Sequence, residues 1–256
     1  MNLGFIGTGH ITKAVVEGIL GSKIKFTKIY LSKRNKKISS FLNKKSKKIV
    51  IVNKNQDIIN KSNWVFLAIT PAVGNKILKN LKFKKNKTII SFISTIKMKD
   101  LKKIIKVKSK IVRAIPLPFI SLRKGPVPIF PPNKKVKSFF DKLGTGLEIK
   151  NEKLSLNFWS LSSMMAPFYK LLETLTNWLI SKGIKKQDAQ KYITSLFLAL
   201  SADAVNKSSK GLDVLVKNSQ TPKGLNQQAL NELQKSGFFK HLVNTSNSIL
   251  KRLKKV

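Results

Sequence analysis

The sequence predicts an α/β domain built on a doubly wound parallel sheet, residues 1–150, followed by an all-helical domain, residues 151–256. Two observations carry this prediction. Over the first 150 residues, short apolar runs alternate with segments of helical periodicity, which is the pattern of βαβ units with parallel strands. From Leu154 onward the apolar spacing becomes helical and stays so.

Composition limits the class of protein. At 256 residues and 42% hydrophobic content, the chain can bury the core of one large domain or two modest ones. It has no cysteine, which excludes disulfides, thiolate catalysis and zinc-thiolate sites and fits a reducing compartment. No apolar run approaches the roughly 18 residues that span a bilayer, and no basic leader precedes an apolar segment at the start. We therefore expect a cytoplasmic protein with no membrane segment.

The charge is strongly positive. Fifty-one Lys and Arg residues against eleven Asp and Glu give a formal net charge of +40, and the lysine runs extend from end to end. These runs lack interleaved aromatic residues, arginine pairs for base edges and any nucleic-acid-binding motif. We therefore expect solvated lysine surfaces and no nucleic-acid partner, with a field that attracts anionic substrates and cofactors.

The first motif is glycine-rich. An apolar run at residues 3–6 meets Gly7 and Gly9, and a segment with helical spacing follows over residues 11–20. In a dinucleotide-binding βαβ unit, Gly7 would allow the sharp turn and Gly9 would let backbone amides approach a pyrophosphate at the helix N-terminus. Thr12 stands at the third glycine position of this fingerprint. A plain βα turn also uses glycine, but the strand and helix on either side favour a Rossmann-like domain.

The second expected strand, residues 28–31, bears on the choice of cofactor. NAD-binding folds place an Asp or Glu about 20 residues past the glycines for the ribose 2′-hydroxyl, whereas an Arg accommodates a 2′-phosphate. This chain has no acid there and offers Ser32 and Arg34. The pattern predicts NADPH rather than NADH, and the alternative is that Arg34 is one more surface cation.

The remaining strands follow the same pattern. Apolar runs that predict them lie at residues 49–52, 64–69, 87–93 and 110–115. Residues 125–132 carry four prolines and are expected to form one extended segment at the edge of the sheet. A helix over residues 134–143 and a strand over 147–149 complete the domain.

The C-terminal half predicts five helices. They begin with a long segment interrupted by Pro167 and end with a helix from Phe238 to Leu253. Several are apolar on more than one side, which indicates burial against a partner subunit in a homodimer or higher homo-oligomer. A monomeric bundle is the alternative.

Several motifs, in order, resemble those of the pyrroline-5-carboxylate reductase family, the NAD(P)H enzymes that reduce the cyclic imine pyrroline-5-carboxylate to proline. Residues 4–10 match its glycine motif, with His10 where Asn is usual, and residues 68–71 resemble its Ala-Val-Lys-Pro turn. Residues 113–117 resemble its Arg-x-Met-Pro-Asn strand end, and residues 221–226, Thr-Pro-Lys-Gly-Leu-Asn, fall on its substrate loop. The likeness covers nearly the whole chain.

The resemblance implies a set of site residues and no metal. It places cofactor contacts at Gly7, Gly9, His10, Ile11, Ser32, Arg34, Asn55, Ala68, Thr70 and Pro71. Thr221 and the amides of Gly224 and Leu225 would hold the carboxylate of a small anionic imino acid, with Lys223 as a further anion contact. Asn226 would hydrogen-bond the ring nitrogen, while water or prior protonation in solution supplies the proton.

Departures from the family concentrate at the substrate end. Thr70 replaces a Lys and Leu117 an Asn, while Met164 and Ala166 stand where two glycines are usual. In the loop, Lys223 replaces a Gly, and Leu225 and Asn226 replace two threonines. The expected function is NADPH-dependent reduction of pyrroline-5-carboxylate to proline, the last step of proline biosynthesis. The alternatives are reduction of another small imino or keto acid and a non-catalytic nucleotide-binding protein.

Overall fold

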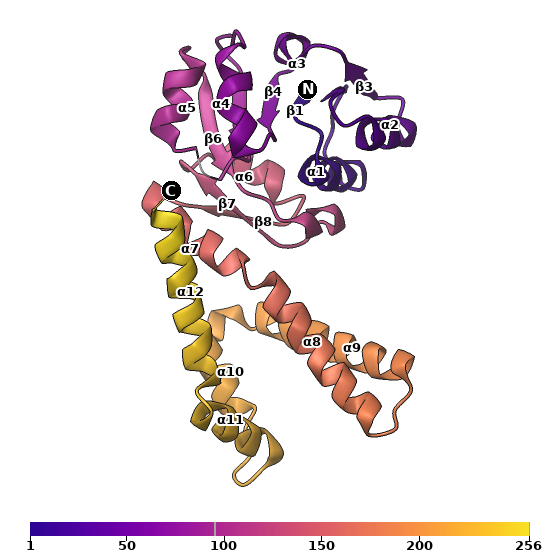
Figure 1. Cartoon of the computed structure of the whole chain (residues 1–256), viewed down its shortest axis with the longest axis vertical. Coiled ribbons are helices and arrows are strands. Elements are labelled where there is room, and N and C mark those ends of the chain that lie inside the picture. The colour runs from indigo at the N-terminus through magenta and orange to yellow at the C-terminus, as the bar shows by residue number, and fades with distance from the viewer. Residues whose placement is uncertain (95, 256) are drawn as a thin grey trace. The chain divides into compact units, whose positions relative to one another are not determined.

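The computed structural model describes residues 1–94 and 96–255, apart from the side chains of residues 71–73 and 75. The chain divides into two compact units, Met1–Phe158 and Trp159–Val256 (Figure 1). The division falls within helix α7 (Glu152–Ser162). The domain boundary that the sequence predicts, after residue 150, lies just before this helix.

The N-terminal unit is built on an eight-stranded sheet with the order β3-β2-β1-β4-β5-β6-β7-β8. The strands are β1 (Leu3–Ile6), β2 (Ile29–Ser32), β3 (Ile49–Val52), β4 (Trp64–Leu67), β5 (Thr88–Ser91), β6 (Lys110–Ala114), β7 (Pro126–Phe130) and β8 (Thr145–Glu148). Strands β1 to β6 are all parallel, which confirms the predicted doubly wound sheet. The strand order reverses at β1, and ligands of such sheets bind at the carboxyl ends of strands near this reversal.

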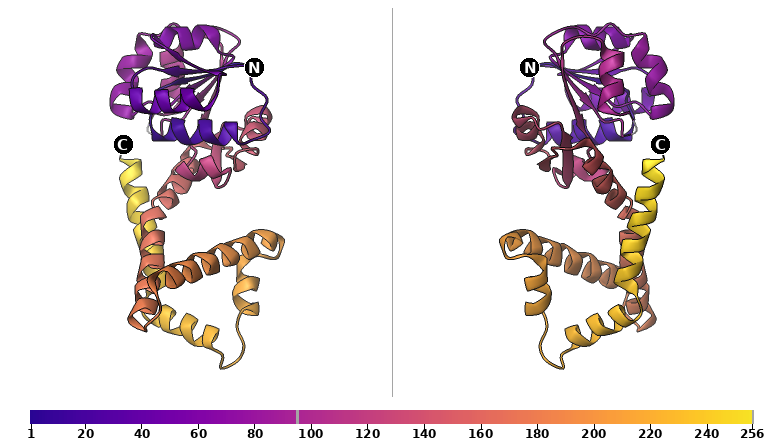
Figure 2. Two further views of the ribbon diagram at one scale, coloured as in Figure 1. Left: turned by 90° about the vertical axis from the view of Figure 1, so that its right-hand side faces the viewer. Right: turned by 90° about the vertical axis from the view of Figure 1, so that its left-hand side faces the viewer.

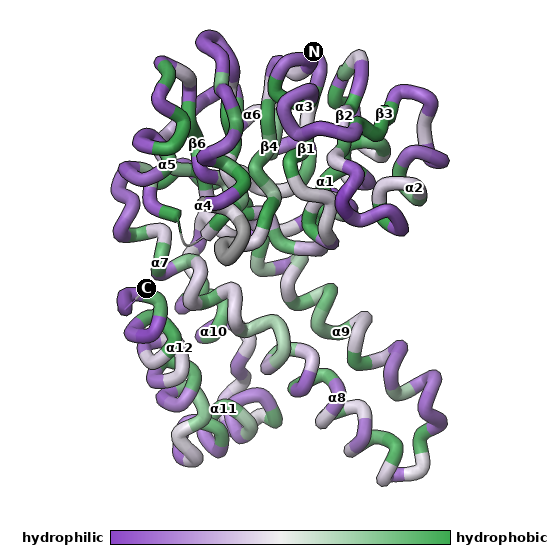
Figure 3. Tube along the Cα trace, turned by 45° about the horizontal axis from the view of Figure 1, so that its top comes forward, coloured by the Kyte–Doolittle hydropathy of each residue, from purple (hydrophilic) through white to green (hydrophobic). Residues whose placement is uncertain are grey.

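Helices cover both faces of the sheet (Figure 1). They are α1 (His10–Leu20), α2 (Lys36–Lys45), α3 (Asn55–Lys61), α4 (Pro71–Lys79), α5 (Met98–Ile105) and α6 (Lys134–Phe140), with a 3-10 helix η1 (Pro118–Leu122). Successive residues of a strand point to opposite faces, so Phe5 and Ile6 of β1 belong to two different core clusters. Hydrophobic residues accordingly concentrate along β1, β2 and β4 (Figure 3).

The proline-rich segment does not form the sheet edge, so that prediction is wrong. Strand β7 is antiparallel to β6 on one side and parallel to β8 on the other, which leaves β8 as the edge. Proline is tolerated there because the ladder with β6 covers only the pairs Arg113↔Phe130 and Ala114↔Ile129. Pro128 still accepts a hydrogen bond from the Ile115 N–H, so its missing N–H falls on the side where β6 has already ended.

The C-terminal unit is helical, as predicted. It contains the end of α7, then α8 (Met165–Ser181), α9 (Lys186–Asn206), η2 (Ser208–Lys210), α10 (Leu212–Asn218), α11 (Leu225–Lys235) and α12 (Phe238–Lys254). Helices α8 and α9 pack as a hairpin, and α11 packs against α12 (Figure 2). Pro167 lies in the first turn of α8, where its missing N–H costs nothing.

This unit buries little of its own surface. Among its described residues only Ser160, Ala189 and Ile193 are buried. Large apolar side chains such as Trp178, Leu198 and Val205 are exposed on α8 and α9. In residues 1–94 and 96–255, none of the helices combines the length and apolar character needed to cross a membrane.

Candidate functional site

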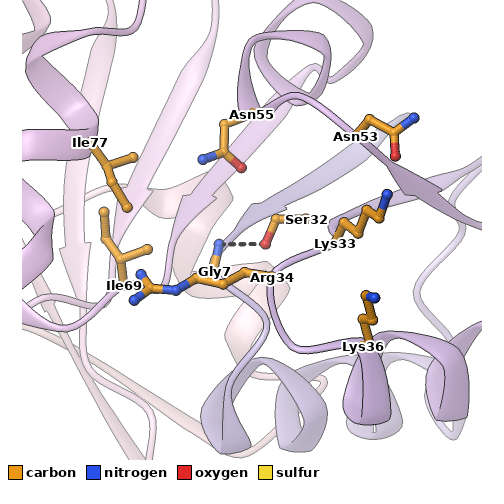
Figure 4. Close-up of a pocket in the computed structure, with 9 residues that line it drawn as sticks. All are labelled: Gly7, Ser32, Lys33, Arg34, Lys36, Asn53, Asn55, Ile69 and Ile77. Carbon is orange, nitrogen blue, oxygen red and sulfur yellow. Dashed lines mark hydrogen bonds between the residues drawn. The ribbon is translucent and has the colours of Figure 1, made fainter.

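A cavity of about 360 Å³ lies at the carboxyl ends of the strands beside the glycine turn. Its lining residues are Gly7, Ser32, Lys33, Arg34, Lys36, Asn53, Asn55, Ile69 and Ile77 (Figure 4). Four of these, Gly7, Ser32, Arg34 and Asn55, are among the residues that the family resemblance assigns to the cofactor. They come from the ends of β1 and β2 and from the start of α3, so the fold brings together residues up to 48 positions apart in the sequence, from 7 to 55.

The cavity is lined by cations and by no carboxylate. Lys33, Arg34 and Lys36 follow β2, and no Asp or Glu is among the lining residues. The turn that carries them is held at the start of α2, because the side chain of Asn35 caps that helix by accepting from the Ile38 N–H at 3.1 Å. Three cations on one short turn suit a phosphate group better than a ribose hydroxyl.

Gly7 is required by its backbone conformation and by its surroundings. Its φ of +99° lies in a region that L-residues rarely adopt, and a Cβ there would stand 2.4 Å from the Ala68 carbonyl oxygen. Ala68 itself is held by its N–H, which donates to the Ile6 carbonyl at 2.8 Å. The first glycine therefore allows β1 and β4 to pack closely where the chain turns into α1.

Gly9 serves a different purpose. It is the N-cap residue of α1 with no side-chain cap, and a Cβ at this position would meet nothing within 4 Å. The first helical hydrogen bond runs from the Lys13 N–H to the Gly9 carbonyl, so the N–H groups of the preceding turn have no partner within the helix. With no acidic residue in this turn, the helix start is open to an anion.

Substituting the two glycines should separate these roles. Gly9→Val is expected to lower the free energy of unfolding by no more than about 1 kcal/mol, because valine is a poorer N-cap than glycine. It should weaken NADPH binding at least tenfold, because the side chain fills open space over the free amides. Gly7→Val should instead lower the free energy of unfolding by about 2–4 kcal/mol. Urea denaturation and calorimetric titration measure both effects. Tight NADPH binding by Gly9→Val would contradict the assignment.

Other predicted cofactor residues do not line this cavity. His10 is exposed and Ile11 half-buried on the first turn of α1. Thr70 is the exposed N-cap residue of α4, and the side chain of Pro71 lies outside the described residues. The roles assigned to these residues, and to Ala68, remain predictions.

Five lining residues were missed by the sequence prediction. Asn53 and Ile69 directly follow strands β3 and β4, so the rule that ligands lie at strand carboxyl ends could have found them. Lys33 and Lys36 belong to a lysine run that did not stand out from the others. Ile77 lies on α4 and is placed only by the tertiary fold.

An ion pair between a buried arginine and a partly exposed glutamate lies at the end of β6, where the sequence resembles the family's Arg-x-Met-Pro-Asn motif. The guanidinium of Arg113 pairs with the Glu152 carboxylate and donates to the Ser94 carbonyl. The same carboxylate accepts from the Met98 N–H at 2.7 Å. Burial lowers the pKa of Arg113 from its ordinary value while the charge of Glu152 opposes that shift, and the guanidinium stays protonated at neutral pH. The pair thus ties the end of β6 to the starts of α5 and α7.

The predicted substrate loop, residues 221–226, is held by hydrogen bonds within the loop and to the residues on either side of it. The Gly224 N–H donates to the Thr221 carbonyl at 2.8 Å, and the Lys223 N–H donates to Gln227 Oε1 at 2.8 Å. Asn226 Nδ2 donates to the Ser219 carbonyl at 2.8 Å, and Leu225 is exposed. The amide of Gly224 is thus engaged within the loop, and the unbonded donors of the helix start are those of the following residues.

The backbone conformation at position 223 explains why a glycine would suit this position. Its φ is +60°, in the left-handed region that costs a residue with a Cβ about 1–2 kcal/mol. We expect Lys223→Gly to raise the melting temperature by about 2–4 °C. The matched change Lys217→Gly, in the last turn of helix α10, should lower it, because glycine is a poor helix former and the change removes a cation from the helix C-terminus. Equal effects of the two substitutions in thermal unfolding would argue against strain at position 223.

Two known protein families match separate parts of the chain, one in each of the two units. Residues 2–95 match the family described as NADP oxidoreductase, coenzyme F420-dependent. Residues 157–256 match the family described as pyrroline-5-carboxylate reductase dimerisation. Within the described residues, no group of three or more His, Asp or Glu side chains is placed to hold a metal ion.

Relatives align over almost the full length. Pyrroline-5-carboxylate reductase 2 of Bacillus subtilis (strain 168) is 20% identical over 259 residues, covering 98% of this chain and 93% of the relative. A pyrroline-5-carboxylate reductase structure from Coxiella burnetii shares the fold with a TM-score of 0.86 and 20% identity, covering 99% and 97% of the two chains. The Plasmodium falciparum pyrroline carboxylate reductase, solved with NADP bound, has a TM-score of 0.83 and 20% identity, covering 100% and 97%. An N-terminal oxidoreductase family and a C-terminal reductase dimerisation family in this order show that the chain belongs to the pyrroline-5-carboxylate reductase family.

Proposed function

We propose that this oxidoreductase reduces pyrroline-5-carboxylate to proline with NADPH, the last step of proline biosynthesis. The observation that carries the proposal is the cavity beside the glycine turn, where Lys33, Arg34 and Lys36 meet an uncapped helix start and no carboxylate. Membership of the family supplies the reaction class, and the cavity supports the choice of cofactor.

The residues present fit a dinucleotide phosphate. The free N–H groups at the start of α1 would hold the diphosphate, with open space over Gly9 for its approach. Arg34 and its two neighbouring lysines would hold the ribose 2′-phosphate, and the side chain of Asn55 would contact the same end of the cofactor. When bound, the reduced nicotinamide supplies the hydride, and the protein contributes position and electrostatics.

The loop at residues 221–226 would bind the substrate. The Thr221 hydroxyl and the amide of Leu225 at the start of α11 are donors suited to a carboxylate. Asn226 has one amide hydrogen committed to the Ser219 carbonyl, which orients its carboxamide and leaves Oδ1 to accept from a protonated ring nitrogen. Because Asn226 is a poor proton donor, we propose that the imine is protonated before it is reduced.

NADPH consumption across a substrate panel tests this function. The full-length chain should oxidise NADPH fastest with pyrroline-5-carboxylate. Faster turnover with another cyclic imine or with a 2-oxo acid would contradict the proposed substrate. Since Lys223, Leu225 and Asn226 depart from the family's loop, a different small imino acid is the second candidate. Nucleotide binding without turnover on any substrate would favour a non-catalytic protein.

We also propose that the C-terminal unit forms a homodimer or higher homo-oligomer. An apolar groove of about 800 Å³ lies between α8 and α12, lined by residues that include Met164, Phe168, Leu171, Phe238, Leu242 and Val243. Leu198 and Val205 are 62% and 72% exposed at positions i and i+7 of α9, so they share one helix face. Apolar surface of this extent on a helical unit is typical of an interface between subunits.

Light scattering of the purified chain tests the assembly. Its mass should be at least twice 28.8 kDa. Val205→Glu should shift it toward the monomer because a carboxylate would be buried in the interface, whereas Asn206→Glu adds the same charge at the adjacent polar position and should not. A wild-type mass of 28.8 kDa would contradict the proposal.

A further inference from the structure

Two buried hydroxyls clamp the backbone of Gly7. Ser32, at the end of β2, lies 4% exposed, and its Oγ accepts from the Gly7 N–H at 3.1 Å. Thr12, fully buried in α1, donates from Oγ1 to the Gly7 carbonyl at 2.7 Å. Both polar groups of this glycine are thus satisfied by side chains. The hydroxyl of Thr12 also explains why a threonine suits the third position of the glycine fingerprint.

A third hydroxyl, that of Thr8, decides the direction of the hydrogen bond between the side chains of Thr8 and Ser32. Thr8 Oγ1 donates to the Ser32 carbonyl at 2.7 Å, and the two side-chain oxygens of Thr8 and Ser32 are 3.0 Å apart. A hydroxyl has one hydrogen, and that of Thr8 is already used. Ser32 must therefore donate its own hydrogen to Thr8 Oγ1. These bonds form a hydrogen-bond chain that runs from the Gly7 N–H to Ser32 Oγ, to Thr8 Oγ1 and back to the Ser32 carbonyl.

From this hydrogen-bond chain we infer that Ser32, with Thr8, is a positioning residue for the glycine turn at residues 7–9 and does not bind the 2′-phosphate. A phosphate dianion only accepts hydrogen bonds, and the one hydrogen of Ser32 is used by Thr8 Oγ1, so donating it to a phosphate would break that bond. Figure 4 shows the Ser32 hydroxyl directed at the Gly7 amide, while the side chains of Lys33, Arg34 and Lys36 extend from the following turn. The hydrogen-bond chain also uses the N–H of Gly7, so the donors for a diphosphate are the backbone N–H groups in the first turn of α1.

The inference, which rests on the proposed use of NADPH, separates two kinds of residue. The hydroxyl chain holds the turn in its binding conformation, so its loss should weaken NADPH and NADH alike, since both carry the diphosphate. The three cations act on the 2′-phosphate, so their loss should weaken NADPH alone. The ratio of the two affinities therefore distinguishes a positioning residue from a phosphate ligand.

Calorimetric titration of the full-length chain with NADPH and with NADH tests the assignment. Ser32→Ala and Thr8→Val should each weaken both nucleotides about tenfold and leave their affinity ratio unchanged within about twofold. The double variant should be no weaker than either single variant, because both remove the same chain. Thr8→Ser keeps the hydroxyl and should restore the affinity, which a loss of packing alone would not explain.

Two results would overturn the inference. Ser32→Ala could weaken NADPH alone, which would make Ser32 a phosphate ligand, or it could weaken neither nucleotide, which would mean that the turn is held without it. If Ser32→Ala does not fold, the affinities of Thr8→Val and Thr8→Ser for NADPH and NADH decide the same question. Failure of the proposed function is seen separately, since the wild-type chain would then bind neither nucleotide.

Discussion

Arg34→Asp should lower the ratio of NADPH to NADH affinity about a hundredfold. The substitution removes a cation that lines the cavity and places a carboxylate beside the 2′-phosphate, which repels it. The same carboxylate can accept from the 2′-hydroxyl of NADH, as acids at this position do in NAD-binding folds. Both effects change the ratio in the same direction. Titration of each nucleotide into the two proteins measures it.

Arg123→Asp is the matched control. Arg123 is exposed at the end of η1 and does not line the cavity, so the same change in net charge occurs away from the site. Its guanidinium lies beside Gly21, at the end of α1 opposite the glycine turn. The substitution should leave the affinity ratio unchanged within about twofold, since exposed charges more than about 10 Å apart are largely screened at 0.1 M salt. An unchanged ratio of NADPH to NADH affinity in Arg34→Asp would refute the proposed role of Arg34. An equal change of that ratio in both variants would mean that the effect of Arg34→Asp is a general effect of net charge.

Arg113→Met should lower the free energy of unfolding by about 3 kcal/mol. The side chain of Arg113 is 3% exposed, and its guanidinium joins Glu152 to the Ser94 carbonyl at the end of β6. Methionine fills much of the volume but leaves the carboxylate without this charge. We take the lower end of the range for breaking a buried pair because Glu152 is 28% exposed and water can screen it. Urea denaturation followed by tryptophan fluorescence measures the loss.

A double-mutant cycle assigns the loss to the pair. Glu152→Gln keeps the shape of the side chain and an oxygen for the Met98 N–H while removing the charge. Combined with Arg113→Met, it should show a coupling energy of about 1–3 kcal/mol. Additive effects would mean that Arg113 stabilises the unit through its packing and its contact with Ser94 rather than through the ion pair.

The sequence predicts the sheet well because each strand is a short apolar run that ends in polar or turn residues. Runs such as Ile49–Val52 and Trp64–Leu67 suit parallel strands that are covered on both faces. The place of β7 could not be predicted, because the rule that proline marks a sheet edge assumes a full ladder on both sides. Here the neighbour β6 ends after two residue pairs, which is a property of the tertiary structure.

The same limit applies to the site. Gly7 and Arg34 were predicted from their spacing along the chain and Asn55 from the family resemblance, and the fold brings them to one cavity. Position could not show that the hydrogen of Ser32 is used by Thr8, or that the amide of Gly224 is engaged by the Thr221 carbonyl. Hydrogen-bond donors are committed by geometry, and the geometry of a turn depends on residues distant in sequence.

The central claim is that the glycine turn and the cations after β2 hold NADPH. Calorimetric titration of the wild-type chain with NADPH and NADH tests it most directly. We predict saturable binding of one nucleotide per chain, with NADPH bound at least tenfold more tightly than NADH. Binding of neither nucleotide, or tighter binding of NADH, would contradict the claim.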